Sequence, residues 1–314
     1  MDLGSGTGRS RSGLRSNNRT RTRIRLRVVG SITTGVLAGG ILITSPPQAG
    51  EAQIQNPGQR PSTDLSYIGA NLLVGGLTAG VASAIRGRSI LKGFAQGAFG
   101  GTVSYLGKRV TAEDMPGAGL IGRQIGAIGA SVVRSAAFGS GLLVDTLVMP
   151  IGPVRAYVSL LGIRNTRFRV DLQEIAWLAY NLGQPNQTLD LGASLSSGSF
   201  VFTSVEEIRG FGDIATGRAA PGVLVVRLTG NGQIPPDVIA HERVHVNQFD
   251  YLKITAGLPL EGAVRRGLGA DSVEFLDRFD FGVGQYPFQW VLTGAWLPRS
   301  RQLFEIEAEY LENP

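Results

Sequence analysis

The chain contains no cysteine and only two histidines among its 314 residues. The absence of cysteine excludes disulfides and any metal centre built from thiolates. A metal site in this chain would therefore combine histidines with carboxylates. The two histidines, His241 and His245, lie four positions apart, and this spacing makes them the most informative feature of the sequence.

The chain also has almost no net charge outside its first 27 residues. Those residues hold eight arginines against one acid, Asp2, for a charge of +7, whereas the whole chain carries +6, so the other 287 residues total −1. A nearly neutral body offers no basic surface to the phosphates of DNA or RNA. We therefore expect no nucleic-acid partner.

The arginine-rich start resembles the basic region of a leader. It precedes an uncharged apolar stretch, residues 28–45, and small residues at Gly50 and Ala52. This order predicts a signal peptide over residues 1–52, with an uncleaved N-terminal anchor or an organellar transit peptide as alternatives. Residues 53–65 are polar and contain two prolines, which is typical of a linker. We expect an exported protein of the bacterial cell envelope, in the periplasm or associated with a membrane.

The histidines belong to the motif H-E-R-V-H, in which Glu242 follows the first of them. On a helix, positions i and i+4 share one face, so His241 and His245 could bind one metal ion. Glu242 is then placed to accept a proton from water that the metal activates. Asp237 is a suitable N-cap for a helix expected near residues 238–252.

Two histidines leave a zinc ion without its third protein ligand. Because the chain has no other histidine and no cysteine, that ligand must be a carboxylate. A helix predicted at residues 303–310 carries Glu305 and Glu309 on one face. Glu307, on the other face of the same helix, is the competing ligand.

Together these two segments resemble the gluzincin metallopeptidases, in which H-E-x-x-H is followed by a helix bearing E-x-x-A-D or a close variant. The resemblance implies that Glu305 is the third ligand of a single Zn²⁺ and that Ala308 is the small residue of the pattern. Glu309, in place of the usual Asp, would hydrogen-bond a ligating histidine. Residues 241–248 are also similar to small uncharacterised bacterial proteins of gluzincin type.

The resemblance further implies hydrolysis of a peptide or protein substrate, with Glu242 as general base. Since there is no spare histidine to stabilise the oxyanion, the candidates are Tyr310, Tyr251 and Tyr286. Two other interpretations stay open. The metal could be structural, in a non-catalytic envelope protein that works through its glycine-rich segment, or the fold could persist without metal.

Residues 66–150 form a glycine-rich region in which we expect three apolar helices, near residues 66–85, 90–106 and 120–138. Glycines recur there at four-residue spacing: Gly76 and Gly80; Gly93, Gly97 and Gly101; Gly122 and Gly126. Small residues at this spacing let helix backbones approach closely. The pattern predicts either membrane association through residues 66–138 or a soluble helical layer packed on the sheet.

Residues 151–314 are expected to form a β-sheet and a metallopeptidase-like domain. The predicted strands are 154–160, 167–172, 187–195, 200–202 and 222–228, which suggests an antiparallel sheet of four to six strands. Strand 222–228, just before the motif helix, is the candidate to pair with extended substrate. The expected fold class is α+β: glycine-rich helices, an antiparallel sheet, the H-E-x-x-H helix and a C-terminal ligand helix.

Overall fold

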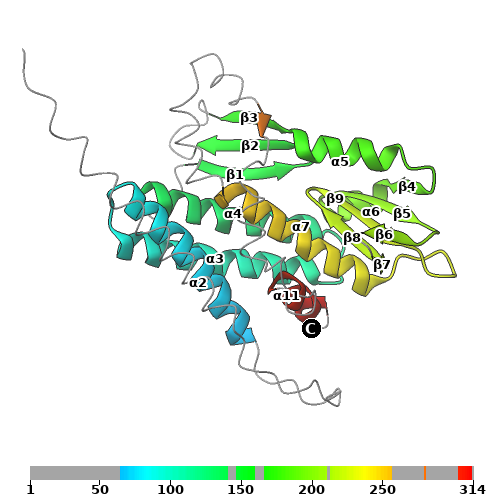
Figure 1. Ribbon diagram of the computed structural model, residues 1–314, viewed down its shortest axis with the longest axis horizontal. Helices are drawn as coiled ribbons and strands as arrows, with labels where there is room; N and C mark the ends of the chain where they lie inside the picture. Colours follow the sequence, from blue (N-terminus) through cyan, green and yellow to red (C-terminus); the bar gives the residue numbers. More distant parts are fainter. Residues whose placement is uncertain are drawn as a thin grey trace, which may run out of the picture.

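The computed structural model describes residues 64–140, 146–159, 166–210, 213–256, 279–280 and 303–312. Figure 1 shows glycine-rich helices on one side, two small sheets on the other, and one long helix between them. The predicted signal peptide and nearly all of the predicted linker lie outside the described residues. The expected α+β class is confirmed.

The glycine-rich region forms three consecutive helices, as predicted. They are α2 (Asp64–Ile85), α3 (Ile90–Ala112) and α4 (Ala118–Phe138). The side chain of Ser89 caps α3 by accepting a hydrogen bond from the Lys92 amide, at 3.3 Å. Gly139 ends α4 in the left-handed region, with φ of 66°, where glycine is favoured.

Glycines lie where these helices approach one another most closely. A β-carbon at Gly97 would overlap the carbonyl oxygen of Gly75, and one at Gly101 would overlap the carbonyl oxygen of Asn71. Gly107 meets the backbone of α4 in the same way. The close helix approach expected from the glycine spacing is therefore present, and α2, α3 and α4 form one tightly packed layer.

The first sheet follows this layer in sequence and packs on α4 through its first strand. It has the order β1-β2-β3-β10. Its strands are β1 (Thr146–Ile151), β2 (Val154–Ser159), β3 (Arg167–Asp171) and β10 (Phe279–Asp280). The first three are antiparallel, and β10 pairs parallel with β3. β1 falls inside the predicted glycine-rich region of residues 66–150, so that region is not purely helical.

The second sheet has the order β4-β5-β9-β8. Its strands are β4 (Gln187–Asp190), β5 (Phe200–Ser204), β9 (Val223–Arg227) and β8 (Gly217–Ala220). Helices α5 (Leu172–Leu182) and α6 (Leu191–Ser197) precede and follow β4, and β6 (Ile208–Gly210) and β7 (Asp213–Ala215) form a separate hairpin. The predicted strand 187–195 ends early because Asp190 caps α6, accepting a hydrogen bond from the Ala193 amide at 2.8 Å.

We expected one antiparallel sheet of four to six strands, whereas the described residues form two four-stranded sheets. Each sheet is mainly antiparallel and contains one parallel pair, β10 with β3 in the first and β5 with β9 in the second. The candidate substrate-pairing strand, residues 222–228, corresponds to β9, which lies between β5 and β8 and so is an interior strand. Four of the five residues of β9 are fully buried, which suits an interior strand. Within the described residues the edge beside the motif helix is β8.

The H-E-x-x-H motif lies on α7 (Pro236–Ala256), which contacts both the helical layer and the second sheet. The helix begins at Pro236, so Asp237 lies in its first turn and is not the N-cap we expected. Proline is tolerated at the first helical position because the amide there has no partner within the helix. The C-terminal helix α11 (Leu303–Glu312) packs against α7 beside the motif, as Figure 1 shows.

Candidate metal centre

Three side chains from α7 and α11 meet at one point. The Nε2 atoms of His241 and His245 are 3.0 Å apart. Oε2 of Glu305 lies 3.5 Å from Nε2 of His241 and 3.6 Å from Nε2 of His245. The side chains are only 11–15% exposed. These three residues, the predicted ligand set, could therefore hold a metal ion.

Each histidine makes a second contact through its other ring nitrogen. Nδ1 of His241 is 2.7 Å from Oε2 of Glu312, and Nδ1 of His245 is 2.8 Å from Oε1 of Gln248. A carboxylate only accepts hydrogen bonds, so Nδ1 of His241 carries a proton. Contacts of this kind hold the rings of metal-binding histidines in orientation.

Glu312 makes a hydrogen bond to a ligating histidine of the kind that the resemblance implies for Glu309. Glu309 is exposed, whereas Glu312 makes the hydrogen bond to His241. Glu305, Glu309 and Glu312 lie on one face of α11 because they follow i, i+4, i+7 spacing. The crossing of α11 over α7 places the last of them, not the middle one, beside the ring.

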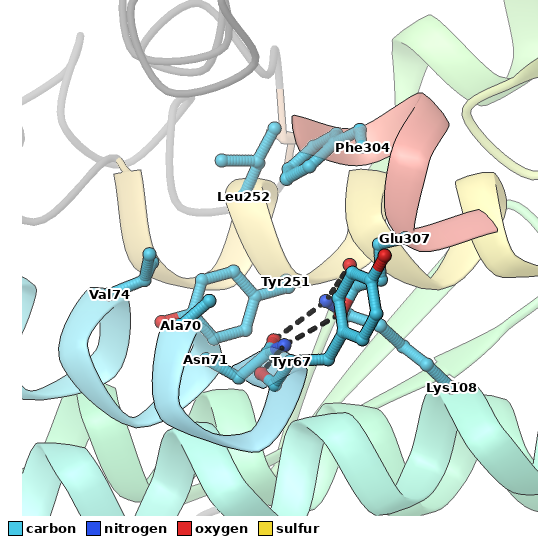
Figure 2. Close-up of a pocket in the computed structure, with 9 residues that line it drawn as sticks. All are labelled: Tyr67, Ala70, Asn71, Val74, Lys108, Tyr251, Leu252, Phe304 and Glu307. Carbon is cyan, nitrogen blue, oxygen red and sulfur yellow. Dashed lines mark hydrogen bonds and ion pairs between the residues drawn. The ribbon is translucent and has the colours of Figure 1, made fainter. Parts of the chain in front are cut away.

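Glu307, the competing ligand, points away from the histidines into a buried polar network. It accepts hydrogen bonds from Nζ of Lys108 at 2.7 Å, Nδ2 of Asn71 at 2.6 Å and Nε2 of Gln248 at 2.8 Å. Figure 2 shows the first two of these donors with Glu307. The cavity beside the network is about 20 Å³, room for a single water, so it is not a substrate pocket.

Glu242 is 4% exposed and faces the edge strand β8. A β-carbon built on Gly217, the first residue of β8, would lie 2.6 Å from Oε1 of Glu242 and 2.8 Å from its Cγ. Cγ1 of Val238 would lie 2.7 Å away, so any other residue at position 217 would displace the side chains of both Glu242 and Val238. The candidate general base thus packs against the edge strand β8.

The electrostatic surroundings of the ligands favour a cation. Burial by itself lowers the pKa of His241, but the hydrogen bond with Glu305 and the charges of Glu242 and Glu312 outweigh burial. The pKa of His241 is consequently raised above its usual value. Three carboxylates near one partly buried imidazole make a negative environment, which a bound cation would neutralise.

Of the three candidate tyrosines, the structure describes Tyr251 and Tyr310. Tyr251 packs in the core cluster with Ala79 and Val133, and its burial raises the pKa of its hydroxyl. Tyr310 stacks on Tyr67 of α2, with the ring centroids 4.4 Å apart. Tyr286 lies outside the described residues. An oxyanion role has no support at Tyr251, which belongs to the core.

Beyond the motif, α7 is anchored by a buried charge cluster. Its six members are Arg123 (α4), Arg155 (β2), Asp171 (β3), Glu174 (α5) and, on α7 itself, Asp250 and Lys253. Burial alone would raise the pKa of Asp250, but Arg123 at 2.5 Å and Arg155 at 2.8 Å hold it at about 2. Burial raises the pKa of Glu174 more than Arg123, 3.7 Å away, lowers it, and the resulting pKa is about 7.

One described helix, over Leu65–Ile85 of α2, is long and apolar enough to cross a membrane, by length and composition alone. One third of this helix is buried within the structure. Asn71 in its middle makes hydrogen bonds with Lys108 and Glu307. These contacts tie α2 to α3 and α11.

The sequence interpretation missed several residues that support the ligands. Lys108 and Asn71 were not singled out, although a lysine within the apolar stretch of α3 was a usable signal for a buried partner. Gly217 and Glu312 carried no comparable signal, because their roles depend on the packing of β8 and α11 against α7. Gln248 lies seven residues after His241, on the same helical stripe as the histidines, and it contacts His245.

The chain matches no protein-family model, no curated protein and no solved structure, so the candidate site rests on its own geometry.

Proposed function

We propose that this protein is a zinc-dependent metallopeptidase of gluzincin type. One observation carries the proposal: the described ligand group has three protein ligands, with Glu242 beside them. Structural zinc sites usually have four protein ligands, whereas catalytic sites have three and leave one position open. The described ligands therefore favour a catalytic site over a structural one.

The separations between ligand atoms support zinc. Tetrahedral coordination with bonds of about 2.0–2.1 Å separates two ligand atoms by about 3.4 Å. The separations among His241, His245 and Glu305 are 3.0, 3.5 and 3.6 Å, close to that value. The donors are two imidazole nitrogens and one carboxylate oxygen, a combination found in catalytic zinc sites.

The roles of the chain's own groups follow from their positions. A bound zinc ion supplies Lewis acidity, which polarises a carbonyl and activates water near neutral pH. Glu242 accepts the proton of the attacking water and delivers it to the leaving amine. The strand β8 lies next to Glu242 and, within the described residues, ends the sheet, so an extended peptide could pair with it there.

The test is metal analysis and peptide hydrolysis with the full-length protein. We expect one zinc per chain in the wild type, little zinc in His241→Ala, and full zinc without activity in Glu242→Gln. Digestion of unstructured protein substrates, read by mass spectrometry, measures hydrolysis. Sub-stoichiometric zinc in the wild type would overturn the proposal, as would hydrolysis that survives in Glu242→Gln.

A structural role for the metal is the second candidate. The ligands come from α7 and α11, so a bound ion would tie the C-terminal helix to the core. This function requires zinc without hydrolysis. If the wild type binds zinc and cleaves no peptide under any condition tried, the structural role is the better explanation.

We also propose export to the bacterial cell envelope. The arginine-rich start and the apolar residues 28–45 support a leader, and α2 supports contact with a membrane. The test is fractionation followed by alkaline washing of membranes. Release of the protein into the supernatant would exclude integral insertion, and recovery from the cytoplasm would exclude export.

A further inference from the structure

The buried network behind His245 connects the metal ligands to the glycine-rich helices. It runs from His245 to Gln248, from Gln248 to Glu307, and from Glu307 to Lys108 and Asn71. Four helices meet here: α7, α11, α3 and α2. Lys108 and Glu307 are about 5% and 3% exposed, and Gln248 is fully buried, so these hydrogen bonds do not compete with bulk water.

The ends of this network fix the orientation of both amides within it. Lys108 can only donate, and the Glu307 carboxylate can only accept. Asn71 therefore turns its oxygen to Lys108, at 2.8 Å, and its nitrogen to Glu307. By the same rule Gln248 turns its nitrogen to Glu307, and a second bond from that nitrogen, to the carbonyl oxygen of Phe304 at 3.2 Å, agrees.

The orientation of Gln248 determines the proton position on His245. With its nitrogen committed to Glu307, Gln248 presents only its oxygen to Nδ1 of His245. That oxygen can only accept, so the hydrogen bond with Gln248 requires a proton on Nδ1, and a neutral His245 that makes this bond is the Nδ1–H tautomer. Nε2 is then left with its lone pair directed at the other ligands, which is the form that binds a metal.

We propose that Lys108, Asn71, Glu307 and Gln248 form a relay that selects the metal-binding tautomer of His245. These residues are positioning residues that act through His245 and have no contact with the metal. The inference rests on the proposed zinc site. It also gives the glycine-rich layer a direct role in that site, because α2 and α3 must approach closely for Asn71 and Lys108 to reach Glu307.

The test reads the tautomer directly, without metal and without activity. Full-length metal-free protein labelled with ¹⁵N-histidine gives signals from only two rings, and a His241→Gln variant assigns them. Long-range ¹H–¹⁵N correlation, recorded over a pH series, reports which nitrogen of each ring is protonated. We expect Nδ1–H for His245 in the wild type.

Two substitutions of Gln248 distinguish the loss of a proton acceptor from a change in packing. Gln248→Leu keeps most of the volume but removes the acceptor, so His245 should change to the Nε2–H form that free histidine favours. Gln248→Glu keeps an acceptor and should retain Nδ1–H. Gln96→Leu, a buried glutamine of α3 outside the relay, is the matched control and should leave both rings unchanged.

The remote end is tested with the neutral double variant Lys108→Met/Glu307→Gln. It removes the obligatory donor and acceptor without burying a lone charge, and it should give a mixture of His245 tautomers. Zinc affinity, measured by chelator competition, should fall about 10- to 100-fold in Gln248→Leu.

An Nε2–H form of His245 in the wild type would overturn the proposed relay. An unchanged Nδ1–H form of His245 in either Gln248→Leu or the double variant would also overturn it. If the tautomers change as expected but the wild type binds no zinc, the relay stands and the proposed function fails.

Discussion

Gly217 of β8 lies so close to Glu242 of α7 that a β-carbon at position 217 would come within 2.6 Å of the carboxylate oxygen Oε1. The contact places the candidate general base against the sheet edge. It also constrains the rotamer of Glu242, because the side chain cannot move toward β8. Glycine at this position thus has a role that no other residue can fill without movement of Glu242.

We predict that Gly217→Ala lowers peptidase activity by 10-fold or more while zinc content stays at the wild-type level. The reason is that small displacements of a catalytic group cost on the order of 100-fold in rate. Steady-state hydrolysis and metal analysis on the same samples check this. Gly230→Ala is the matched control, since a β-carbon there meets nothing within 4 Å. Equal activity in the two variants would show that Gly217 does not constrain Glu242.

The two glutamates at the end of α11 should differ in their effect on metal affinity. Glu312→Gln weakens the hydrogen bond to Nδ1 of His241 and should reduce zinc affinity by about 10- to 100-fold. Glu309→Gln, an exposed position on the same face, should change affinity little. Chelator competition measures both. A larger loss in Glu309→Gln would restore the role that the family pattern implies for that residue.

Stability should depend on pH through Glu174. Its pKa in the folded protein, about 7, exceeds the value of about 4.3 expected in the unfolded chain. The folded state therefore binds more protons between these two values, and stability falls as the pH rises from about 4.3 to about 7. The difference corresponds to a loss on the order of 3 kcal/mol.

Glu174→Gln should remove this decrease in the free energy of unfolding between a pH of about 4.3 and about 7. Denaturant unfolding of metal-free protein across that pH range measures it, and metal must be absent because its binding adds a pH dependence of its own. Glu207→Gln, at an exposed glutamate, is the control and should keep the wild-type slope. If Glu174→Gln keeps the slope as well, the pKa of Glu174 is not raised.

Close packing of α2 on α3 should be sensitive to one methyl group. Gly101→Ala places a β-carbon against the carbonyl oxygen of Asn71 and should destabilise the fold by about 1–3 kcal/mol. Gly69→Ala, in α2 with nothing within 4 Å, should be neutral or stabilising by up to about 1 kcal/mol. Urea unfolding of both variants checks this. Similar stabilities would mean that the two helices can separate at little cost.

The features predicted well from the sequence are those encoded locally. The glycine-rich helices were located closely because long, mostly apolar segments are bounded there by Arg86 and Gly87, and by Gly117 and Gly139. The motif helix and Glu305 were found because helical spacing alone places their side chains on one face. The three ligands do meet.

The features missed depend on how distant elements pack. Glu309 and Glu312 lie on the same face of α11, so only the position of that helix over His241 distinguishes them. β8 is a short strand, G-R-A-A, without alternation of polar and apolar residues. The sequence gives no sign that Asp250 and Lys253 of α7 are buried, because their partners come from distant segments: Arg123 and Arg155 for Asp250, and Asp171 of β3 for Lys253.

The buried charge cluster has a consequence for how accurately α7 is placed. Three cations and three anions from five elements match one another in a single alignment. A shift of α7 by one turn, or a rotation about its axis, would leave Asp250 and Lys253 buried without their partners. This would reduce the free energy of unfolding by several kcal/mol. The cluster therefore fixes the position and rotation of α7. Asp250 and Lys253, five and eight residues after His245, determine how both imidazoles face α11.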